Sequence, residues 1–170
     1  MTTTPTRTRP TAPTAPTTVL ETTLRLVRPP EDVFPLLCPV LEYLWIPDWS
    51  CTMVHSRSGV AELGCVFLRD GGETWLTTRY EPPTAIDYAI VTPDLTASTL
   101  RFRLAPTPGG GTTAALRSTR TAMSPAGAES VRAWPLDDQL AMWRLREAQA
   151  NHYLTTGTML EGPPPVYPGS

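Results

Sequence analysis

The sequence predicts an α+β fold in which a strongly bent antiparallel sheet of about seven strands wraps around one long helix. The order of the elements supports this prediction. One extended segment is followed by two short helix-like segments rich in Pro and Trp. Six more extended segments follow, and one long helical pattern comes near the end of the chain. A sheet bent in this way leaves a cavity beside its helix, so we expect a small-molecule ligand.

The first strand is predicted over residues 19–27, where Leu20, Leu24 and Leu26 alternate with the residues between them. A short helix is expected from Pro30, because Pro suits the first helical turn and the acids that follow suit its positive end. Pro39 ends this helix, and residues 40–45 predict a second one.

The other six strands are separated by turn signals such as Asp70-Gly71-Gly72, which is typical of a hairpin. They are predicted over residues 51–56, 65–69, 73–80, 86–91, 98–104 and 112–123.

The long helix is expected from residue 136 to about Thr156, with Gly157 as the residue that ends it. Its predicted apolar face consists of Leu136, Leu140, Trp143, Ala150 and Leu154. Glu147 interrupts that face, so it is a candidate carboxylate inside the cavity. Alternatively, Glu147 reaches solvent from the edge of the face or pairs with Arg144 or Arg146.

The chain has 170 residues, of which 41% are apolar, and this fits one domain with a sizeable core. We expect a disordered leader rich in Thr and Pro at residues 1–16, a domain at 17–158 and a Pro-rich tail at 159–170. The first 19 residues lack the apolar segment of a secretory signal, and no apolar run is long enough to span a membrane. A cytoplasmic protein without membrane contact is therefore expected.

The net charge of −2 argues against nucleic acid as a partner. All 14 basic residues are Arg, and together with the abundant Ala, Pro and Thr this is typical of a GC-rich bacterial genome. The absence of Lys excludes Schiff-base and pyridoxal chemistry on a side chain of this chain. No cofactor is predicted.

Two stretches of the chain, residues 38–51 and 58–67, resemble a bacterial subgroup of the SRPBCC superfamily, which includes START domains, birch-pollen allergens and polyketide cyclases. They read Cys-Pro-Val-x-Glu-Tyr-x-Trp-Ile-Pro-x-Trp-x-Cys and Ser-Gly-x-Ala-Glu-x-Gly-Cys-Val-Phe. Residues 75–80 and 152–154 are similar too, and the resemblance in element order covers residues 18–157. It implies the helix-grip fold with a hydrophobic ligand cavity. It implies no particular reaction, because the superfamily contains carriers, receptors and enzymes.

Alternation within the strands predicts which side chains line the cavity. Trp75 and Arg79 share one face of their strand, and Tyr88 lies on the apolar face of the next. His55 shares a face with Cys51 and suits proton transfer near neutral pH, although it could equally be an exposed strand end.

Glu42 lies among aromatic residues, which would disfavour its charged form and suit a general acid or base. It could instead face water or pair with an Arg. Trp45, Trp49 and Trp143 are candidate ligand contacts or simple core residues.

No metal site is predicted, because Cys38, Cys51 and Cys65 lack zinc-ligand spacing and suit buried packing.

Three functions remain open on these grounds. The first is a cyclase or dehydratase, a lyase or isomerase acting on a polyketide-like molecule, with Glu42, His55 or Glu147 moving protons and Arg79 and Tyr88 stabilising an enolate. The second is a non-catalytic carrier or sensor of a hydrophobic metabolite. The third is an interaction module with a collapsed core. Either a monomer or a homodimer is compatible with the sequence.

Overall fold

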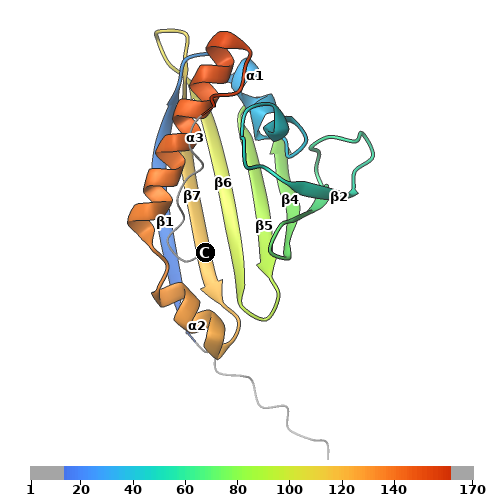
Figure 1. Cartoon of the computed structure of the whole chain (residues 1–170), viewed down its shortest axis with the longest axis vertical. Helices are drawn as coiled ribbons and strands as arrows, with labels where there is room; N and C mark the ends of the chain where they lie inside the picture. The colour runs from blue at the N-terminus through green and yellow to red at the C-terminus, as the bar shows by residue number, and fades with distance from the viewer. Residues whose placement is uncertain (1–13, 162–170) are drawn as a thin grey trace, which may run out of the picture.

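The computed structural model describes residues 14–161. The strands are β1 (Thr17–Leu26), β2 (Cys51–His55), β3 (Val66–Arg69), β4 (Glu73–Glu81), β5 (Ala85–Thr92), β6 (Thr96–Pro106) and β7 (Thr112–Ala122). The helices are α1 (Pro30–Val33), the 3₁₀ helices η1 (Phe34–Leu37) and η2 (Leu41–Leu44), α2 (Pro125–Arg132) and α3 (Leu136–Thr156). The predicted α+β fold with two short helical segments after the first strand is confirmed (Figure 1).

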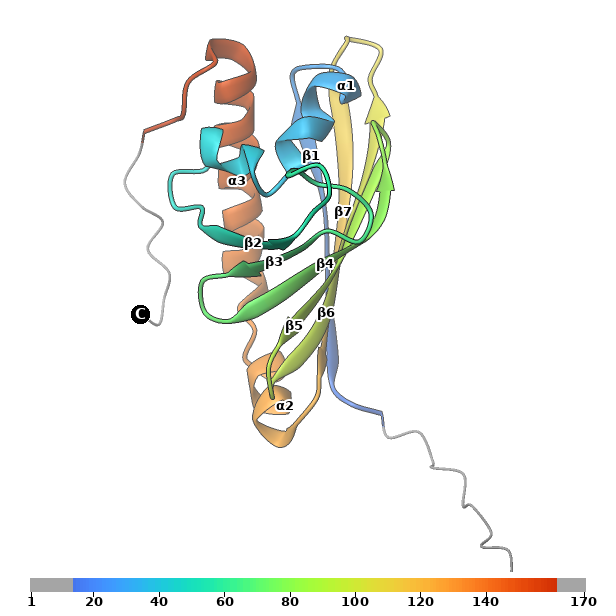
Figure 2. The ribbon, with the colours of Figure 1, turned by 90° about the vertical axis from the view of Figure 1, so that its right-hand side faces the viewer.

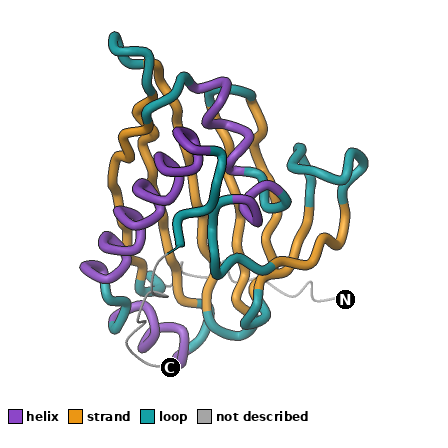
Figure 3. The backbone as a smooth tube through the Cα atoms, turned by 45° about the horizontal axis from the view of Figure 1, so that its top comes forward, coloured by secondary structure: helices purple, strands orange, loops and turns teal. Residues whose placement is uncertain are grey.

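The seven strands form one antiparallel sheet in the order β1-β7-β6-β5-β4-β3-β2. All of the helices lie on one side of this sheet (Figure 3). The long helix α3 packs mainly against β1, at one edge of the sheet. Strands β2 to β4 curl toward the helix side, so the sheet is strongly curved (Figure 2). The helix and the middle of the sheet are thereby held apart.

Polar side chains of α3 attach the helix to edge strand β1. The backbone N–H of Arg25 donates to Glu147 Oε2 at 2.7 Å, and that of Val27 donates to Asn151 Oδ1 at 2.9 Å. The Asn151 amide donates back to the Arg25 carbonyl at 2.8 Å. A strand at the edge of a sheet exposes unpaired backbone groups, and here the helix satisfies several of them.

The boundaries of α3 follow the sequence prediction, but α2 was not predicted. Gly157 ends α3 with a φ of 73°, a left-handed conformation that Gly adopts without steric cost. The signal for α2 is present in the sequence: Ser124 caps the helix by accepting from Gly127 N, and Pro125 occupies the first helical turn. The sequence prediction ends the last strand at residue 123 and has no helix before residue 136, so this signal was missed.

Two irregularities in strand pairing change which side chains face inward. The register shifts between Thr77 and Arg79 in β4 and between Met53 and His55 in β2. An extra residue in one strand reverses the alternation beyond it. Predictions that extended a strict period of two through these positions therefore fail.

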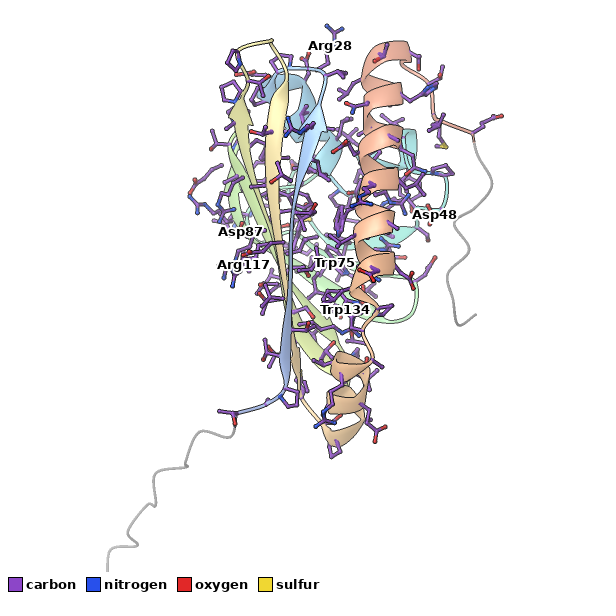
Figure 4. The ribbon with its side chains drawn as sticks, turned by 90° about the vertical axis from the view of Figure 1, so that its left-hand side faces the viewer. Arg28, Asp48, Trp75, Asp87, Arg117 and Trp134 are labelled. Carbon is purple, nitrogen blue, oxygen red and sulfur yellow. The ribbon has the colours of Figure 1, made fainter. Side chains whose placement is uncertain are left out.

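The apolar core lies on the concave face of the sheet, and the convex face carries charged residues. Leu100, Phe102 and Leu104 of β6 are buried, while Arg101 between them is exposed. Asp87 and Arg117 point away from the helix side in Figure 4, and they pair with Arg103 and Glu21, respectively. Surface ion pairs of this kind contribute little to stability.

The predicted leader lies mostly outside the described residues, as does most of the predicted tail. Pro16 is described, and its carbonyl accepts from the Ala122 backbone at 2.9 Å. No helix within residues 14–161 is long and apolar enough to cross a membrane.

The packing of α2 against the β5–β6 connection predicts a strong effect of Gly127→Ala. A Cβ at Gly127 would lie 1.8 Å from the Leu95 carbonyl oxygen, so the backbone must shift. We expect a loss of about 1–3 kcal/mol in the free energy of unfolding, measured by urea denaturation. Gly109→Ala is the matched control, because a Cβ there meets nothing within 4 Å and its expected effect is within about 0.5 kcal/mol. Equal stability of the two variants would show that α2 is not seated tightly on this connection.

Candidate functional site

A cavity of about 430 Å³ lies between the concave face of the sheet, the η1 and η2 segments and α3. Small-molecule sites typically measure roughly 300–1,000 Å³. A space of this size excludes the collapsed core that was one of the three possibilities. Trp75 and Trp134 both point into the region between sheet and helix (Figure 4).

The floor of the cavity includes one continuous row of paired residues across five strands. Its members are Phe67 on β3, Trp75 on β4, Ile90 on β5, Ser98 on β6 and Arg120 on β7. Residues of neighbouring antiparallel strands that pair directly have their side chains on the same face. The strand register therefore fixes both the apolar and the polar parts of this floor.

Three aromatic donors hold the short helical segment that forms one wall. Trp45 Nε1 donates to the Leu36 carbonyl at 3.0 Å, and Trp49 Nε1 donates to the Pro39 carbonyl at 2.7 Å. The Tyr88 hydroxyl donates to the Leu37 carbonyl at 2.7 Å. Short 3₁₀ helices leave carbonyl groups without a partner, and these bonds satisfy three of them. The predicted contacts Trp45, Trp49 and Tyr88 thus line a wall with fixed geometry.

The other two predicted tryptophans also line the cavity. The Trp75 ring lies 5.4 Å from the rings of Phe67 and Tyr88, measured between centroids. Trp143 on α3 packs edge-on against Phe102 at 5.7 Å. Each of these rings packs in the core and also lines the cavity. The sequence left open whether the tryptophans are core residues or ligand contacts, and their positions are compatible with both.

Glu42 on η2 is the one predicted catalytic residue that the structure brings into the cavity lining. Loss of hydration raises the pKa of its carboxyl from 4.5 to about 8, although the positive charges of Arg69 and Arg146 counteract part of the rise. The group is consequently mostly protonated at neutral pH. A carboxylic acid in this state can donate a hydrogen bond or a proton to a ligand oxygen.

Tyr88 keeps its proton as well. Burial, and next the charge of Glu42, raises the pKa of the Tyr88 hydroxyl well above 10. The hydroxyl is committed as a donor to Leu37, which leaves its oxygen as an acceptor only. Tyr88 is thus a poor candidate for donating to an enolate oxygen, the role the sequence analysis suggested for it.

The inward face of α3 is more polar than predicted. Arg146 and Gln149 are 8% and 4% exposed, and Arg146 Nη1 donates to Gln149 Oε1 at 2.8 Å and to Asp48 at 2.9 Å. Sequence reasoning assigned Glu147 to this face. The helix is rotated so that Glu147 lies at the edge of the inward face and contacts β1 instead of the cavity.

Arg79 and His55 also lie outside the cavity lining, and strand irregularities explain both. The bulge in β4 turns Arg79 outward, where it pairs with Glu81 at 2.7 Å, and Tyr80 faces the core in its place. The shift in β2 leaves His55 exposed at the end of the strand. The expectation that Arg79 faces inward was wrong, and for His55 the structure shows the other alternative, an exposed strand end.

Several polar residues of the lining were not found from the sequence. These are Arg69, Glu73, Ser98, Ser118, Arg120, Gln139 and Arg146. Arg69 and Arg120 follow apolar or small residues at even spacing on the inward face, so alternation carried the signal. Alternation by itself leaves such positions ambiguous, because charged residues are rarely buried.

No group of His, Cys, Asp and Glu residues within the described chain is arranged to hold a metal ion. Cys38 and Cys65 are buried, Cys51 is half-buried, and all three are free thiols. Burial raises the pKa of the Cys51 and Cys65 thiols, which disfavours reactive thiolates.

Solved structures provide the comparison with known proteins. CalU16 from Micromonospora echinospora is 13% identical, with a TM-score of 0.56 over 85% of this chain and 88% of its own. Ara h 8.0201 is 15% identical, with a TM-score of 0.60 over 83% of this chain and 99% of its own. DynU16, from the dynemicin biosynthetic locus, is 17% identical, with a TM-score of 0.54 over 82% of this chain and 48% of its own. No protein-family model and no curated protein matches the sequence.

These similarities define the class of protein by its fold alone. The chain has the helix-grip fold of the birch-pollen-allergen type, in which a curved seven-stranded sheet and a long C-terminal helix enclose a cavity. This agrees with the resemblance to the SRPBCC superfamily. Membership of that superfamily, and of a particular subgroup within it, stays a prediction.

The raised pKa of Glu42 predicts a pH dependence of stability. The unfolded chain ionises this carboxyl near pH 4.5 and the folded protein near pH 8, so the folded state holds the proton more tightly. The contribution of Glu42 to stability is therefore fully present below about pH 4.5 and is lost as the pH rises toward about 8. Relative to wild type, Glu42→Gln should become more stable across this range in urea denaturation.

A direct titration supports the same prediction. In carbon-13 NMR of protein labelled at glutamate carboxyls, one resonance should titrate near pH 8 and be absent from Glu42→Gln. Glu31→Gln, which removes an exposed carboxyl of α1, controls for general spectral changes. If no resonance titrates near pH 8, the carboxyl of Glu42 is hydrated and ionised at neutral pH, and it cannot serve as the proposed acid.

Proposed function

We propose that the protein binds a hydrophobic small molecule in its cavity and acts on it as a cyclase- or dehydratase-like enzyme, with Glu42 as the acid–base residue. One observation carries this proposal. A carboxyl with a pKa of about 8 faces a cavity lined largely by aromatic and aliphatic side chains. Pairs of an apolar cavity and a strongly perturbed acid are typical of active sites.

The chemistry follows from the protonation state of Glu42. At neutral pH the protonated carboxyl donates to a carbonyl oxygen of the ligand, and this polarises the carbonyl toward attack or enolisation. After donation the carboxylate lies close to the positive charges of Arg69 and Arg146, which stabilise it. The same residue can then take a proton from carbon, as ring closure followed by loss of water requires.

The rigid walls would position the ligand. Trp45 and Trp49 are fixed by hydrogen bonds to backbone carbonyls, so their faces are in place before a ligand binds. A flexible chain held against such faces loses fewer degrees of freedom at the reaction step. The similarity of the fold to a protein from the dynemicin biosynthetic locus is compatible with a substrate from secondary metabolism.

A non-catalytic carrier is the second candidate, and one observation favours it. His55 and Glu147 lie outside the cavity lining, so Glu42 has no second acid–base residue of the predicted set beside it. A carrier needs the cavity but no proton transfer.

Ligand binding in the cavity is tested by Ser98→Trp. Ser98 lies on the cavity floor, so an indole there should fill the space and weaken binding of the fluorescent probe N-phenyl-1-naphthylamine by at least about tenfold. Thr99→Trp is the matched control, because successive strand residues face opposite sides and Thr99 faces outward. Equal binding by both variants would locate the probe elsewhere on the protein.

Catalysis is tested with a linear poly-β-ketone chain supplied by a reconstituted minimal polyketide synthase. We expect wild type to change the distribution of cyclised products seen by mass spectrometry. Glu42→Gln should lower the rate at which the new products form by about 10²–10⁴-fold. Glu31→Gln should retain full activity. If wild type binds N-phenyl-1-naphthylamine but leaves the products unchanged, the carrier is the better description.

A further inference from the structure

We propose that the cavity takes a hydrophobic organic acid, and that Arg69 is the cation that pairs with the ligand's carboxylate or comparable oxyanion. The inference rests on the proposed function, because it specifies the ligand of the same cavity. It holds equally for an enzyme and for a carrier.

Arg69 lies in the cavity wall, and no carboxylate within residues 14–161 forms an ion pair with it. It is the last residue of β3, and its guanidinium carbon lies 3.9 Å from the centre of a Trp49 ring. Its Nε is buried and has no hydrogen-bond partner. None of the ion pairs formed within residues 14–161 includes Arg69.

Three carboxyl groups in or beside the cavity, those of Glu73, Asp48 and Glu42, form no ion pair with Arg69 within residues 14–161. Glu73 is the cross-strand partner of Arg69 in the β3–β4 ladder, but its side chain turns to Trp75, whose Nε1 donates to Glu73 Oε2 at 3.1 Å. Asp48 accepts from Arg146 at 2.9 and 3.2 Å. Glu42 is mostly protonated, because burial raises its pKa to about 8. The positive charge of Arg69 is therefore available to a ligand.

The geometry of Arg69 suits an oxyanion better than a neutral oxygen. A guanidinium presents parallel N–H donors that match the two oxygens of a carboxylate, and the pair is strongest where water is excluded. Stacking on Trp49 fixes the plane of the guanidinium, so little further ordering is needed on binding. Trp49 is in turn held by its bond to the Pro39 carbonyl.

The rest of the cavity calls for an apolar ligand body. Aliphatic and aromatic side chains make up much of its lining, among them Leu24, Leu36, Phe102 and Met142. Arg120, on the opposite side of the floor, also has a buried Nε without a partner, and its guanidinium lies 5.7 Å from the centre of a Trp134 ring. Arg120 has a long contact to Ser130 at 3.4 Å, whereas the guanidinium of Arg69 forms no hydrogen bond within residues 14–161, so we assign the anion to Arg69.

Two fluorescent probes with one apolar body test the inference. N-phenyl-1-naphthylamine is neutral, and 1-anilinonaphthalene-8-sulfonate adds a permanent anion to the same rings. We expect Arg69→Gln to weaken binding of the sulfonate by about tenfold or more and to change binding of the neutral probe by less than about twofold. Arg69→Lys, which keeps the charge, should retain most of the sulfonate affinity. Arg101→Gln, which removes an exposed arginine of the convex face, should change neither.

The pH provides a second, independent measurement. The ionisable groups around Glu42 are Arg69 on β3, Arg146 on α3, Tyr88 on β5, Cys51 on β2, Glu73 on β4 and Asp48 in the loop after η2. When Glu42 ionises above about pH 8, its negative charge competes for Arg69. Sulfonate affinity should then fall in wild type and stay constant in Glu42→Gln, while the neutral probe follows no such trend.

Three results would overturn the inference. The first is that Arg69→Gln weakens binding of the sulfonate no more than binding of the neutral probe. The second is that Arg101→Gln or Arg120→Gln abolishes the sulfonate preference while Arg69→Gln does not. The third is that wild type binds neither probe, and that result alone would also remove the proposed function. Binding of the neutral probe without any role for Arg69 leaves the proposed function standing and refutes only the anionic ligand.

Discussion

The structure depends on one geometric constraint, which is that α3 packs against only one edge of a strongly curved sheet. Glu147 and Asn151 bind the backbone of β1, so this edge is held close to the helix. Strands β2 to β4 curl toward the same side, but they do not pack tightly onto α3. Close packing throughout this space would need large apolar side chains on the inward face of α3. That face carries Met142 and Trp143 but also the polar Arg146, and a cavity of about 430 Å³ remains open.

An open space in this position collapses unless its walls are rigid, and the Pro-rich segment after β1 supplies one rigid wall. Its short helices leave carbonyl groups that cannot find partners within the helix. Trp45, Trp49 and Tyr88 donate to the carbonyls of residues 36, 39 and 37, respectively. Each bond satisfies a polar group that would otherwise be costly to bury, and each fixes an aromatic face toward the cavity. The same residues therefore stabilise the fold and shape the ligand space.

The electrostatics of the cavity follow from its exclusion of water. Desolvation acts on a carboxyl by favouring its neutral form, and Glu42 responds by keeping its proton. A guanidinium cannot respond in this way, because it stays protonated at any accessible pH. Arg69 therefore remains charged beside a neutral acid. A neutral donor next to an uncompensated cation is suited to ligand oxygens, and more to an anionic oxygen than to a neutral one.

Sequence alone determined the order of the elements, the curved sheet, the boundaries of α3 and most of the aromatic lining, because Pro, Gly and hydrophobic alternation are local signals. It missed α2, whose signal, Ser124 followed by Pro125, comes directly after the last predicted strand. It predicted Arg79 inside the cavity and left the positions of His55 and Glu147 open. Bulges in β4 and β2 and the rotation of α3 place all three outside the lining, and these features depend on partners distant in the sequence. Arg69 lines the cavity, whereas Arg79, the arginine expected there, does not. Strand pairing decides this difference, because it fixes the face of the sheet that each side chain occupies.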